Sequence, residues 1–337
     1  MVIAVDASGG EYAPHEIVKG AIKAAQEYKV EIALVGRKEI LYVLAGRHLG
    51  KLGMSIIDAK QVIDFHDSPV EAVSKKPKSS IVVGTNLVRD GLASAFVSAG
   101  NTGAVLYSAL VNLGKIKGIE RPAIGTIVNV NSIAPVLLID SGANADCRPK
   151  HLVQFAYLGT TYTREIFGIS SPRVGLLNNG EEATKGNHLT KESYQLLKKT
   201  GLNFIGNIEG HDISGETTDV VVTDGFTGNI VLKTIEGLSA NWLYSLGQSG
   251  QIFSKAYRLS LQALHRDIGM DSWAKKLDYR ESGGACLLGV NGNIIIAHGR
   301  SQTTAIKNAI GLAIRTVERG ICQKIKEENY EQTSINK

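Results

Sequence analysis

The sequence predicts an α/β protein with three layers, in which helices cover both faces of a mostly parallel central sheet. Short apolar runs rich in Val, Ile and Leu alternate with longer amphipathic stretches from the first residues onward. This alternation is typical of repeated strand–helix–strand units. Several of the apolar runs end in turns rich in Gly, Asn and Asp. In open α/β sheets, ligands bind at such turns, where a strand ends and a helix begins.

The predicted strands are short and evenly distributed along the chain. They comprise residues 2–5, 32–35, 54–57, 95–98, 124–128, 135–139, 174–177, 204–205, 220–223, 285–290 and 294–297. The last two runs enclose Asn291-Gly292, a pair that favours a tight hairpin turn. The stretches between the other runs have the periodicity of helices that cover a sheet.

Residues 226–278 depart from this alternation, because they show helical periodicity and no strand. Between Phe253 and Ile268, apolar residues form one stripe and basic residues form another. We expect a protruding helical hairpin inserted into a single domain of residues 1–320, with its apolar stripe buried in a core or a dimer interface. Contact of this hairpin with an anionic membrane is the alternative. The polar residues 321–337 are expected to form a fraying helix or a disordered tail.

Composition favours a soluble globular protein. Hydrophobic residues make up 43% of the 337 residues and charged residues 20%, which is sufficient for a substantial core. A strand is predicted directly after Met1, which leaves no room for a signal peptide, and no apolar run approaches the roughly 18 residues of a membrane span. We therefore expect a cytoplasmic protein. The three cysteines are far apart and odd in number, so neither a disulfide framework nor a zinc site is predicted.

Two glycine-rich turns are the strongest indication of a binding site. The first, Ser98–Gly103, and the second, Asp224–Asn229, each follow an apolar run and precede a helical stretch. The first amides of a helix lack intrahelical partners and lie at its positive end, so such a turn binds phosphate or carboxylate. The anion-binding residues predicted from these turns are Gly100, Asn101, Thr102, Gly103, Gly225, Thr227 and Gly228.

Four further polar clusters follow predicted strands, at residues 6–10, 140–146, 178–186 and 207–212. We expect all six turns to meet at the same end of one sheet and to form a single site. The other candidate site residues are Asp6, Ser98, Asn144, Asn178, Glu181, Asp224 and His211. The sequence contains no G-x-G-x-x-G, P-loop, G-x-S-x-G or H-E-x-x-H motif, which argues against the usual dinucleotide, nucleotide, serine hydrolase and zinc protease sites.

Taken in order, these motifs resemble those of the phosphate acyltransferases of bacterial phospholipid synthesis. The resemblance covers nearly the whole chain and rests on Asp6-Ala-Ser-Gly-Gly10, Ala13-Pro14, Ser98-Ala-Gly-Asn-Thr-Gly-Ala104, Arg121-Pro-Ala123, Gly142-Ala-Asn144, Val174-Gly-Leu-Leu-Asn178, Gly180-Glu-Glu182, Lys185-Gly186, Gly206-Asn207, Glu209-Gly210, the segment from Asp219 to Asn229, Gly283-Gly284, Leu287–Val290 and His298-Gly299. Ser8, Ser141 and Asn179 stand where the resemblance leads us to expect Met, Val and Ile.

The resemblance implies a fold similar to that of isocitrate and isopropylmalate dehydrogenases and of phosphotransacetylases, and a homodimer. It also implies transfer of a long-chain fatty acyl group from the thioester of acyl carrier protein to inorganic phosphate, which gives acyl phosphate for glycerol-3-phosphate acylation. Phosphate is itself the nucleophile in that reaction, so no Ser–His or Cys–His pair is required. No cofactor and no metal is expected.

Two residues are the predicted catalytic groups. Lys185 is expected to supply positive charge that orients phosphate, and Asn229 to donate a hydrogen bond to phosphate or to the oxyanion. The glycine-rich turn at residues 100–103 is expected to hold the phosphate. For His211 and His298 we favour hydrogen-bonded structural roles over acid–base roles.

The net charge of +5 is mild and favours acidic partners, whereas nucleic acid is not expected because aromatic and basic residues are not interleaved. Acyl carrier protein is acidic, so a basic docking face is expected, either at Lys115, Lys117 and Arg121 or at Arg258, Arg266, Lys275 and Lys276. The alternatives are a phosphotransacetylase that uses acyl-CoA, a dehydrogenase whose metal is held by Asp140, Asp146, Asp219 and Asp224, and a non-enzymatic scaffold.

Overall fold

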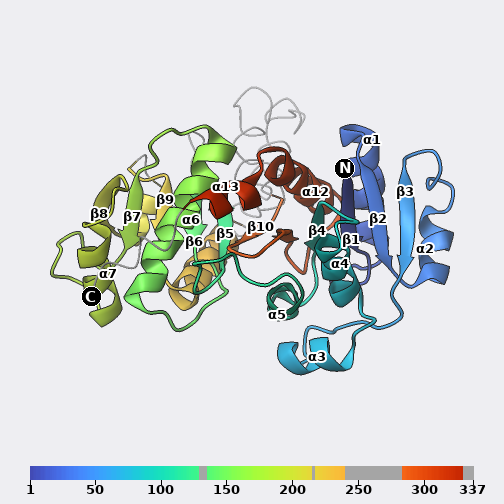
Figure 1. Cartoon of the computed structure of the whole chain (residues 1–337), viewed down its shortest axis with the longest axis horizontal. Helices are drawn as coiled ribbons and strands as arrows, with labels where there is room; N and C mark the ends of the chain where they lie inside the picture. Colours follow the sequence, from blue (N-terminus) through green and yellow to red (C-terminus); the bar gives the residue numbers. More distant parts are fainter. Residues whose placement is uncertain (129–134, 215–216, 240–282, 329–337) are drawn as a thin grey trace, which may run out of the picture.

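A computed structural model describes residues 1–128, 135–214, 217–239 and 283–328 (Figure 1). Its centre is one 11-stranded sheet in the order β3-β2-β1-β4-β11-β10-β5-β6-β9-β7-β8. The strands are β1 (Val2–Asp6), β2 (Glu31–Gly36), β3 (Met54–Asp58), β4 (Ala95–Ser98), β5 (Ala123–Val128), β6 (Val136–Ile139), β7 (Val174–Leu177), β8 (Phe204–Ile208), β9 (Val220–Val222), β10 (Ala285–Leu288) and β11 (Asn293–Ile296). Every run predicted as a strand forms one, and the predicted α/β class is confirmed.

Three antiparallel pairs interrupt the parallel sheet at its centre. They are β11 with β10, β10 with β5, and β5 with β6, and the first is the hairpin predicted around Asn291-Gly292. Three reversals leave β1, β4 and β11 running opposite to β6, β9 and β7. The expectation that all six polar turns meet at the same end of the sheet is therefore wrong, because the strands of the two halves end at opposite edges.

Helices cover both faces of this sheet, which confirms the three predicted layers (Figure 1). They are α1 (His15–Tyr28), α2 (Lys38–Ala45), α3 (Pro69–Lys75), α4 (Ser80–Arg89), α5 (Thr102–Asn112), α6 (Pro149–Phe167), α7 (His188–Leu197), the 3-10 helix η1 (Gly210–Ser214), α12 (Thr303–Glu318) and α13 (Ile321–Glu327). Residues 225–239 also form a helix.

The alternation of side chains along each strand determines which helices each strand contacts. On β4, Val97 belongs to the core cluster that includes α1, α6 and α12, whereas Phe96 belongs to the cluster formed with α4 and α5. Phe96 lies so close to α4 that a Cβ on Gly84 would overlap its ring. A third, smaller cluster lies under helix 225–239. On the face of the sheet that carries α5 and helix 225–239, the apolar clusters of the two halves of the sheet are therefore separate.

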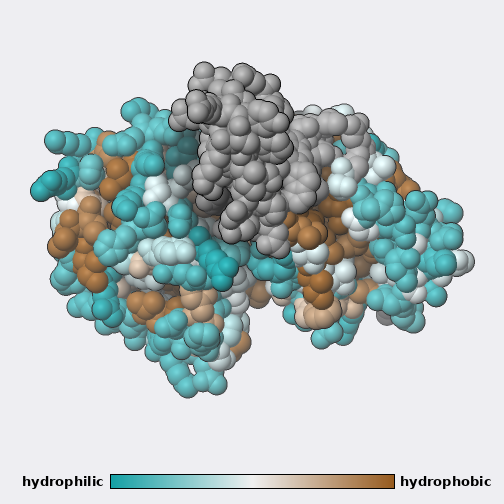
Figure 2. Space-filling view, turned by 180° about the vertical axis from the view of Figure 1, so that it is seen from behind, coloured by the Kyte–Doolittle hydropathy of each residue, from teal (hydrophilic) through white to brown (hydrophobic). Residues whose placement is uncertain are grey.

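Two further expectations concern the helical hairpin of residues 226–278 and the C-terminal stretch from residue 321. The predicted hairpin is described only as helix 225–239, and its predicted stripes between Phe253 and Ile268 lie outside the described residues. The stretch predicted as a polar tail begins with α13, whose Ile321 and Ile325 are buried in the main core. Among the described residues, no helix has the length and apolar character needed to cross a membrane. The rear face is mostly hydrophilic, with separate hydrophobic patches (Figure 2).

Candidate functional site

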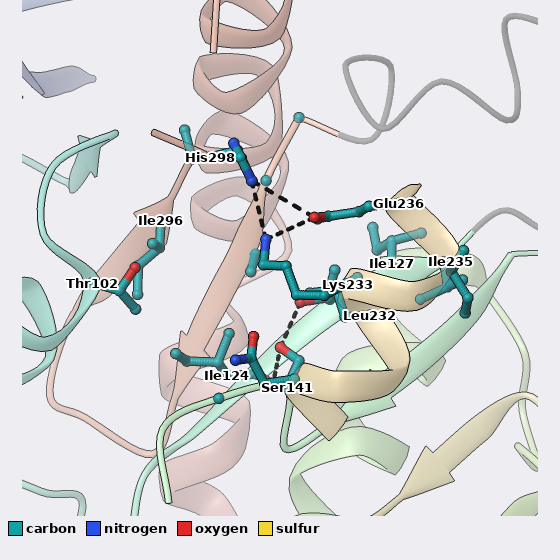
Figure 3. A pocket seen from close by; sticks show the side chains of 18 of the residues that line it. Thr102, Ile124, Ile127, Ser141, Leu232, Lys233, Ile235, Glu236, Ile296 and His298 are labelled. Carbon is teal, nitrogen blue, oxygen red and sulfur yellow. Dashed lines mark hydrogen bonds and ion pairs between the residues drawn. The ribbon is translucent and has the colours of Figure 1, made fainter. Parts of the chain in front are cut away.

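A cavity of about 400 Å³ lies between the two halves of the molecule, over the central strands (Figure 3). Its floor is β5, from which Ile124, Thr126 and Val128 project on one face. The start of α5 forms one wall and helix 225–239 forms the other. Its lining also includes Thr102, Ile127, Ser141, Gly142, Asn229, Leu232, Lys233, Ile235, Glu236, Ile296, His298 and Ser301. Apolar and polar groups thus share one cavity of the size that small-molecule sites have.

A buried carboxylate, Asp140, shapes the part of the rim that follows β6. Its Oδ1 accepts hydrogen bonds from the amides of Ile124, Gly142 and Ala143, and its Oδ2 accepts from the amide and side chain of Asn144 at 2.8 Å. Burial raises the pKa of Asp140, and these donors oppose the shift. Asn144 therefore has a structural role in the turn, while its neighbour Gly142 faces the cavity.

Asp6 has a similar position at the end of β1. Its carboxylate accepts from the amides of Ser8 and Gly9, and from Oγ of Ser98 at 2.7 Å. Burial raises the pKa of Asp6 against the effect of these bonds. The Ser98 hydroxyl in turn accepts from the amide of Gly100. These predicted site residues therefore hold the first glycine-rich turn in place.

That turn presents the start of α5 to the cavity. Asn101 caps the helix by accepting from the amide of Ala104 at 3.0 Å, and its side-chain NH₂ group donates to carbonyl oxygens of the loop at residues 64–67. Gly103 lies against Pro69 of α3. Of the four predicted anion-binding residues in this turn, only Thr102 lines the cavity. It stands in the first turn of the helix, where backbone amides lack intrahelical partners.

The second glycine-rich turn joins β9 to helix 225–239. Asp224 caps helix 225–239 by accepting from the amide and the hydroxyl of Thr227, both at 2.8 Å. The amide of Gly225 donates to the carbonyl of Asn144, and that of Gly228 to the carbonyl of Asp224. These three amides have protein acceptors in the structure, and the anion-binding role of Gly225, Thr227 and Gly228 stays a prediction. Asn229 does line the cavity and lies against Gly142.

Three charged or titratable groups meet at the mouth of the cavity (Figure 3). Nζ of Lys233 lies 2.7 Å from Oε2 of Glu236 and 3.0 Å from Nε2 of His298. The pKa of His298 is lowered, first by burial and then by the charge of Lys233. Lys233 and Glu236 could not be singled out from the sequence, because an i,i+3 charge pair is common on exposed helices. His298 was expected to be structural.

The remaining predicted residues lie outside the cavity lining. Lys185, Asn178 and Glu181 belong to the loop between β7 and α7, where the side chain of Asn178 donates to the carbonyl of Lys185. His211 lies in η1 with an exposed ring beside Glu209 and Asp212. The structure does not bring Lys185 and Asn229 into one cavity, and the catalytic role of Lys185 stays a prediction.

The aspartates of the dehydrogenase alternative have separate partners. Asp219 forms a two-point pair with Arg173, with Nη2 2.9 Å from Oδ1, whereas Asp140 and Asp224 bond to the turns described above. Within the described ranges no cluster of His, Cys, Asp and Glu has the geometry of a metal site. Burial raises the pKa of the Cys147 and Cys286 thiols to about 12, so both stay protonated at neutral pH.

A second, more open groove lies beside the same rim. It is lined by Leu110, Lys115, Glu120, Arg121, Pro122, Asp146, Cys147, Arg148 and His151. It includes two members of the first predicted basic patch, and Nζ of Lys115 donates to the carbonyl of Glu120. The second predicted patch, which starts at Arg258, lies outside the described residues. The chain segment from Arg121 to Ile124 connects the groove to the cavity, because Arg121 lines the groove and Ile124 lines the cavity.

Comparison with known proteins identifies the family. The family model described as fatty acid synthesis protein matches residues 1–324. A phosphate acyltransferase of Dehalococcoides mccartyi is 56% identical over 333 residues, covering 99% of this chain and 96% of that protein. One from Pelotomaculum thermopropionicum is 49% identical, covering 97% of this chain and 94% of its own.

Solved structures confirm the fold. A phosphotransacetylase from Streptococcus pyogenes superposes with a TM-score of 0.58 at 19% identity, covering 94% of both chains. A branched-chain phosphotransacylase from Enterococcus faecalis gives a TM-score of 0.59 at 13% identity, covering 94% of this chain and 99% of its own. At these identities the likeness is one of fold. From the family model and the close relatives, the chain belongs to the fatty acid synthesis protein family.

Proposed function

We propose that this protein is a phosphate acyltransferase, which transfers a long-chain fatty acyl group from acyl carrier protein to inorganic phosphate. The curated relatives at 56% and 49% identity carry the name phosphate acyltransferase and match nearly end to end. The observation that supports the location of the reaction is the cavity, which joins an apolar floor on β5 to a rim that carries Lys233. Those are the two surfaces that an acyl donor and an anionic acceptor require.

The reaction needs positioning more than a protein nucleophile. An oxygen of HPO₄²⁻ attacks the thioester carbonyl carbon, the C–S bond breaks, and the phosphate proton passes to the departing sulfur. The products are acyl phosphate and the free thiol of the carrier. Donors fixed at the rim stabilise the tetrahedral oxyanion and hold phosphate beside the thioester carbonyl.

Two residues predicted from sequence fit these needs from opposite walls. Thr102 offers its hydroxyl and lies in the first turn of α5, where the positive end of the helix favours an anion. Asn229 offers a side-chain amide from helix 225–239. We assign Thr102 to phosphate and Asn229 to phosphate or to the oxyanion. Neither residue needs a shifted pKa for this role.

The acyl donor is proposed to dock at the groove beside the rim. Its charged lining comprises three basic residues, Lys115, Arg121 and Arg148, and two acidic ones, Glu120 and Asp146, so basic groups are in excess there, which complements an acidic carrier protein. Since Arg121 and Ile124 are close in sequence and border the groove and the cavity respectively, a carrier bound there has a short path for its acyl arm. Binding of acyl carrier protein should weaken steeply as salt is raised.

A homodimer and peripheral contact with an anionic membrane complete the proposal. Helix 225–239 exposes Phe226, Ile230 and Leu238 at helical spacing, which offers an apolar surface for association. Light scattering should show a dimer for the wild type. The Ile230→Asp variant should show a smaller dimeric fraction at the same concentration. Flotation with anionic and neutral vesicles tests the membrane contact, which requires stronger binding to the anionic ones.

Release of free thiol from long-chain acyl-acyl carrier protein, with and without phosphate, tests the proposed reaction. We expect release only with phosphate, and a product that hydroxylamine traps as hydroxamate. Thiol release from acetyl-CoA but not from the carrier would favour the phosphotransacetylase instead. Inactivity with both donors would overturn the proposal.

A further inference from the structure

Two arginine side chains in the groove beside the cavity rim have no acidic partner. Arg121 and Arg148 both line this groove, and both are exposed to solvent. Among the residues that the structure describes, no carboxylate forms an ion pair with either guanidinium group. A guanidinium group is a planar fork of N–H donors that stays charged at every physiological pH. The pair is therefore available to an anion that enters the groove.

The other polar groups of the groove hold one another. The amide of Arg148 donates to Nδ1 of His151 at 3.1 Å, so the neutral ring carries its proton on Nε2, which lies 3.2 Å from Oε2 of Glu120. Nζ of Lys115 donates to the carbonyl of Glu120 at 2.9 Å. Glu120 is thus held by His151 and Lys115. Asp146, the second acid of the groove, is exposed, and the basic groups remain in excess.

Both arginines act on one buried side chain, the ring of His151. This residue is 5% exposed, and its pKa is lowered first by burial and further by the charges of Arg121 and Arg148, while its contact with Glu120 opposes the shift. Exposed charges are largely screened beyond about 10 Å. Both guanidinium groups therefore lie near the same ring, and both attract an anion bound in the groove.

Two segments of the chain run from the cavity to this groove. One is Arg121–Ile124, whose first two residues line the groove and whose last residue lines the cavity. The other is the turn at residues 141–148, whose first two residues line the cavity and whose last three line the groove. The side chain of Asn144 joins them, since it donates at 2.8 Å to the carbonyl of Pro122 and to Oδ2 of Asp140. Groove and cavity therefore share one hydrogen-bonded wall.

We propose that Arg121 and Arg148 bind the phosphodiester of a phosphopantetheine arm, the flexible chain that carries the thioester on an acyl carrier protein. The inference rests on the proposed function, which supplies the acyl donor, and names the part of that donor that the groove recognises. A phosphodiester has one negative charge and two free oxygens, which match the forked donors of a guanidinium group. With this end held in the groove, the arm runs along Arg121–Ile124 and places the thioester in the cavity. The contact binds the donor equally before and during the reaction.

Binding of two forms of the carrier protein tests this assignment. The apo form lacks the arm and the holo form carries it with a free thiol, whereas the acidic surface of the protein is the same in both. Isothermal titration calorimetry at constant ionic strength gives both affinities for the full chain. We expect the wild type to bind the holo form at least about 10-fold more tightly than the apo form. Equal affinity for the two forms, or no binding of the holo form, would overturn the proposal.

Replacement of either arginine should act mainly on the arm. Arg121→Gln and Arg148→Gln should each weaken binding of the holo form by about 5- to 20-fold, because a charged hydrogen bond is lost. Binding of the apo form should change by no more than about 2-fold, the general effect of one exposed charge. Arg121→Lys keeps the charge without the fork and should lose less than Arg121→Gln. Retained binding of the apo form also shows that each variant is folded.

Lys150→Gln is the matched control. Lys150 is exposed on the first turn of α6 and lies outside the groove lining, so its replacement should leave the ratio of holo to apo affinity as in the wild type. A loss of equal size for the two forms in the arginine variants would assign both arginines to the acidic surface of the carrier protein. That result would overturn the proposal.

Kinetics separate this proposal from the proposed function. In Arg148→Gln the KM for long-chain acyl-acyl carrier protein should rise by about 5- to 20-fold, with kcat within about 3-fold of the wild type, as expected for a loss of uniform binding. Phosphate-dependent thiol release with an unchanged holo-to-apo ratio in both glutamine variants refutes the arm subsite alone. Preference for the holo form through the arginines, in a protein without thiol release, refutes the proposed function alone.

Discussion

Nζ of Lys233 lies 3.0 Å from Nε2 of His298, although the two residues are 65 positions apart in the chain. Lys233 belongs to helix 225–239, which follows β9, and His298 follows β11. These strands belong to the two oppositely directed halves of the sheet. The contact therefore joins the halves across the mouth of the cavity, and the reversal at the centre of the sheet is what makes it possible.

The first prediction concerns the titration of His298. Its pKa is lowered, chiefly by burial and further by Lys233, so the folded ring should protonate only below its ordinary value of about 6.5. Because the folded-state pKa is depressed, the stability linked to the neutral ring is complete above the unfolded pKa and is lost as pH falls through the folded one. An NMR titration of the ring measures this midpoint.

In Lys233→Met the same midpoint should rise, yet stay below its ordinary value, since burial remains. A wild-type midpoint at or above about 6.5 would contradict the effect of burial and of Lys233 on the His298 ring. His188 provides an internal reference in the same spectra.

The second prediction separates two lysines. Lys233 lines the cavity, whereas Lys185 lies on the exposed loop between β7 and α7. Replacement of Lys233 by Met should reduce kcat/KM for phosphate by about 10²- to 10³-fold, as expected for a lost charged donor to the reacting anion. Lys185→Met in the same assay should cost much less. The reverse order would restore the role that the sequence suggests for Lys185.

The third prediction uses two glycines of one helix. A Cβ on Gly228 would overlap the carbonyl oxygen of Asp140, whereas one on Gly237 meets nothing within 4 Å. Gly228→Ala should therefore destabilise the fold by about 3 kcal/mol, because backbone on both sides must shift. Gly237→Ala should stabilise it by about 0.5–1 kcal/mol through helix propensity. Urea unfolding measures both, and equal effects would refute the close packing of this helix on the turn after β6.

The fourth prediction concerns Glu16, which joins α1 to the start of α12. Hydrogen bonds from Lys19, at 2.8 Å, and from the hydroxyl and amide of Thr303 lower its pKa to about 2. Its stabilising effect should be complete above the unfolded pKa and should disappear as pH falls toward 2. Glu16→Gln should cost about 1–2 kcal/mol at pH 7.

The pH dependence supplies the control for this variant. Wild type and Glu16→Gln should approach equal stability in acid, as measured by urea unfolding at several pH values. A difference that does not change between pH 7 and pH 3 would show that the charge of Glu16 is not what matters.

The strands could be predicted because each contains a short apolar run, and several of these runs, such as β4 and β9, are buried on both faces. The directions of the strands could not be predicted, apart from those in the hairpin at Asn291-Gly292, because an apolar run contains no information on the direction of its strand in the sheet. The position of β5 between β10 and β6 depends on how the whole sheet closes. The expectation of one shared sheet edge failed for this reason.

The site could be predicted in part. Thr102 and Asn229 stand in glycine-rich turns whose local pattern indicates binding, and both line the cavity. Lys233 and Glu236 have no such pattern, since an i,i+3 charge pair is common on exposed helices. Lys233 and Glu236 become candidate functional residues only because β11 places His298 against helix 225–239. Lys185 was singled out by its motif, which indicates nothing about distance to the cavity.

The most direct test of acyl transfer to phosphate is a ³¹P NMR time course with purified protein, long-chain acyl-acyl carrier protein and inorganic phosphate. We predict an acyl phosphate resonance that grows in proportion to free thiol, with a rate that falls at least 10²-fold in Lys233→Met. Free thiol that appears at the wild-type rate without any acyl phosphate resonance would show a thioesterase and would contradict the account.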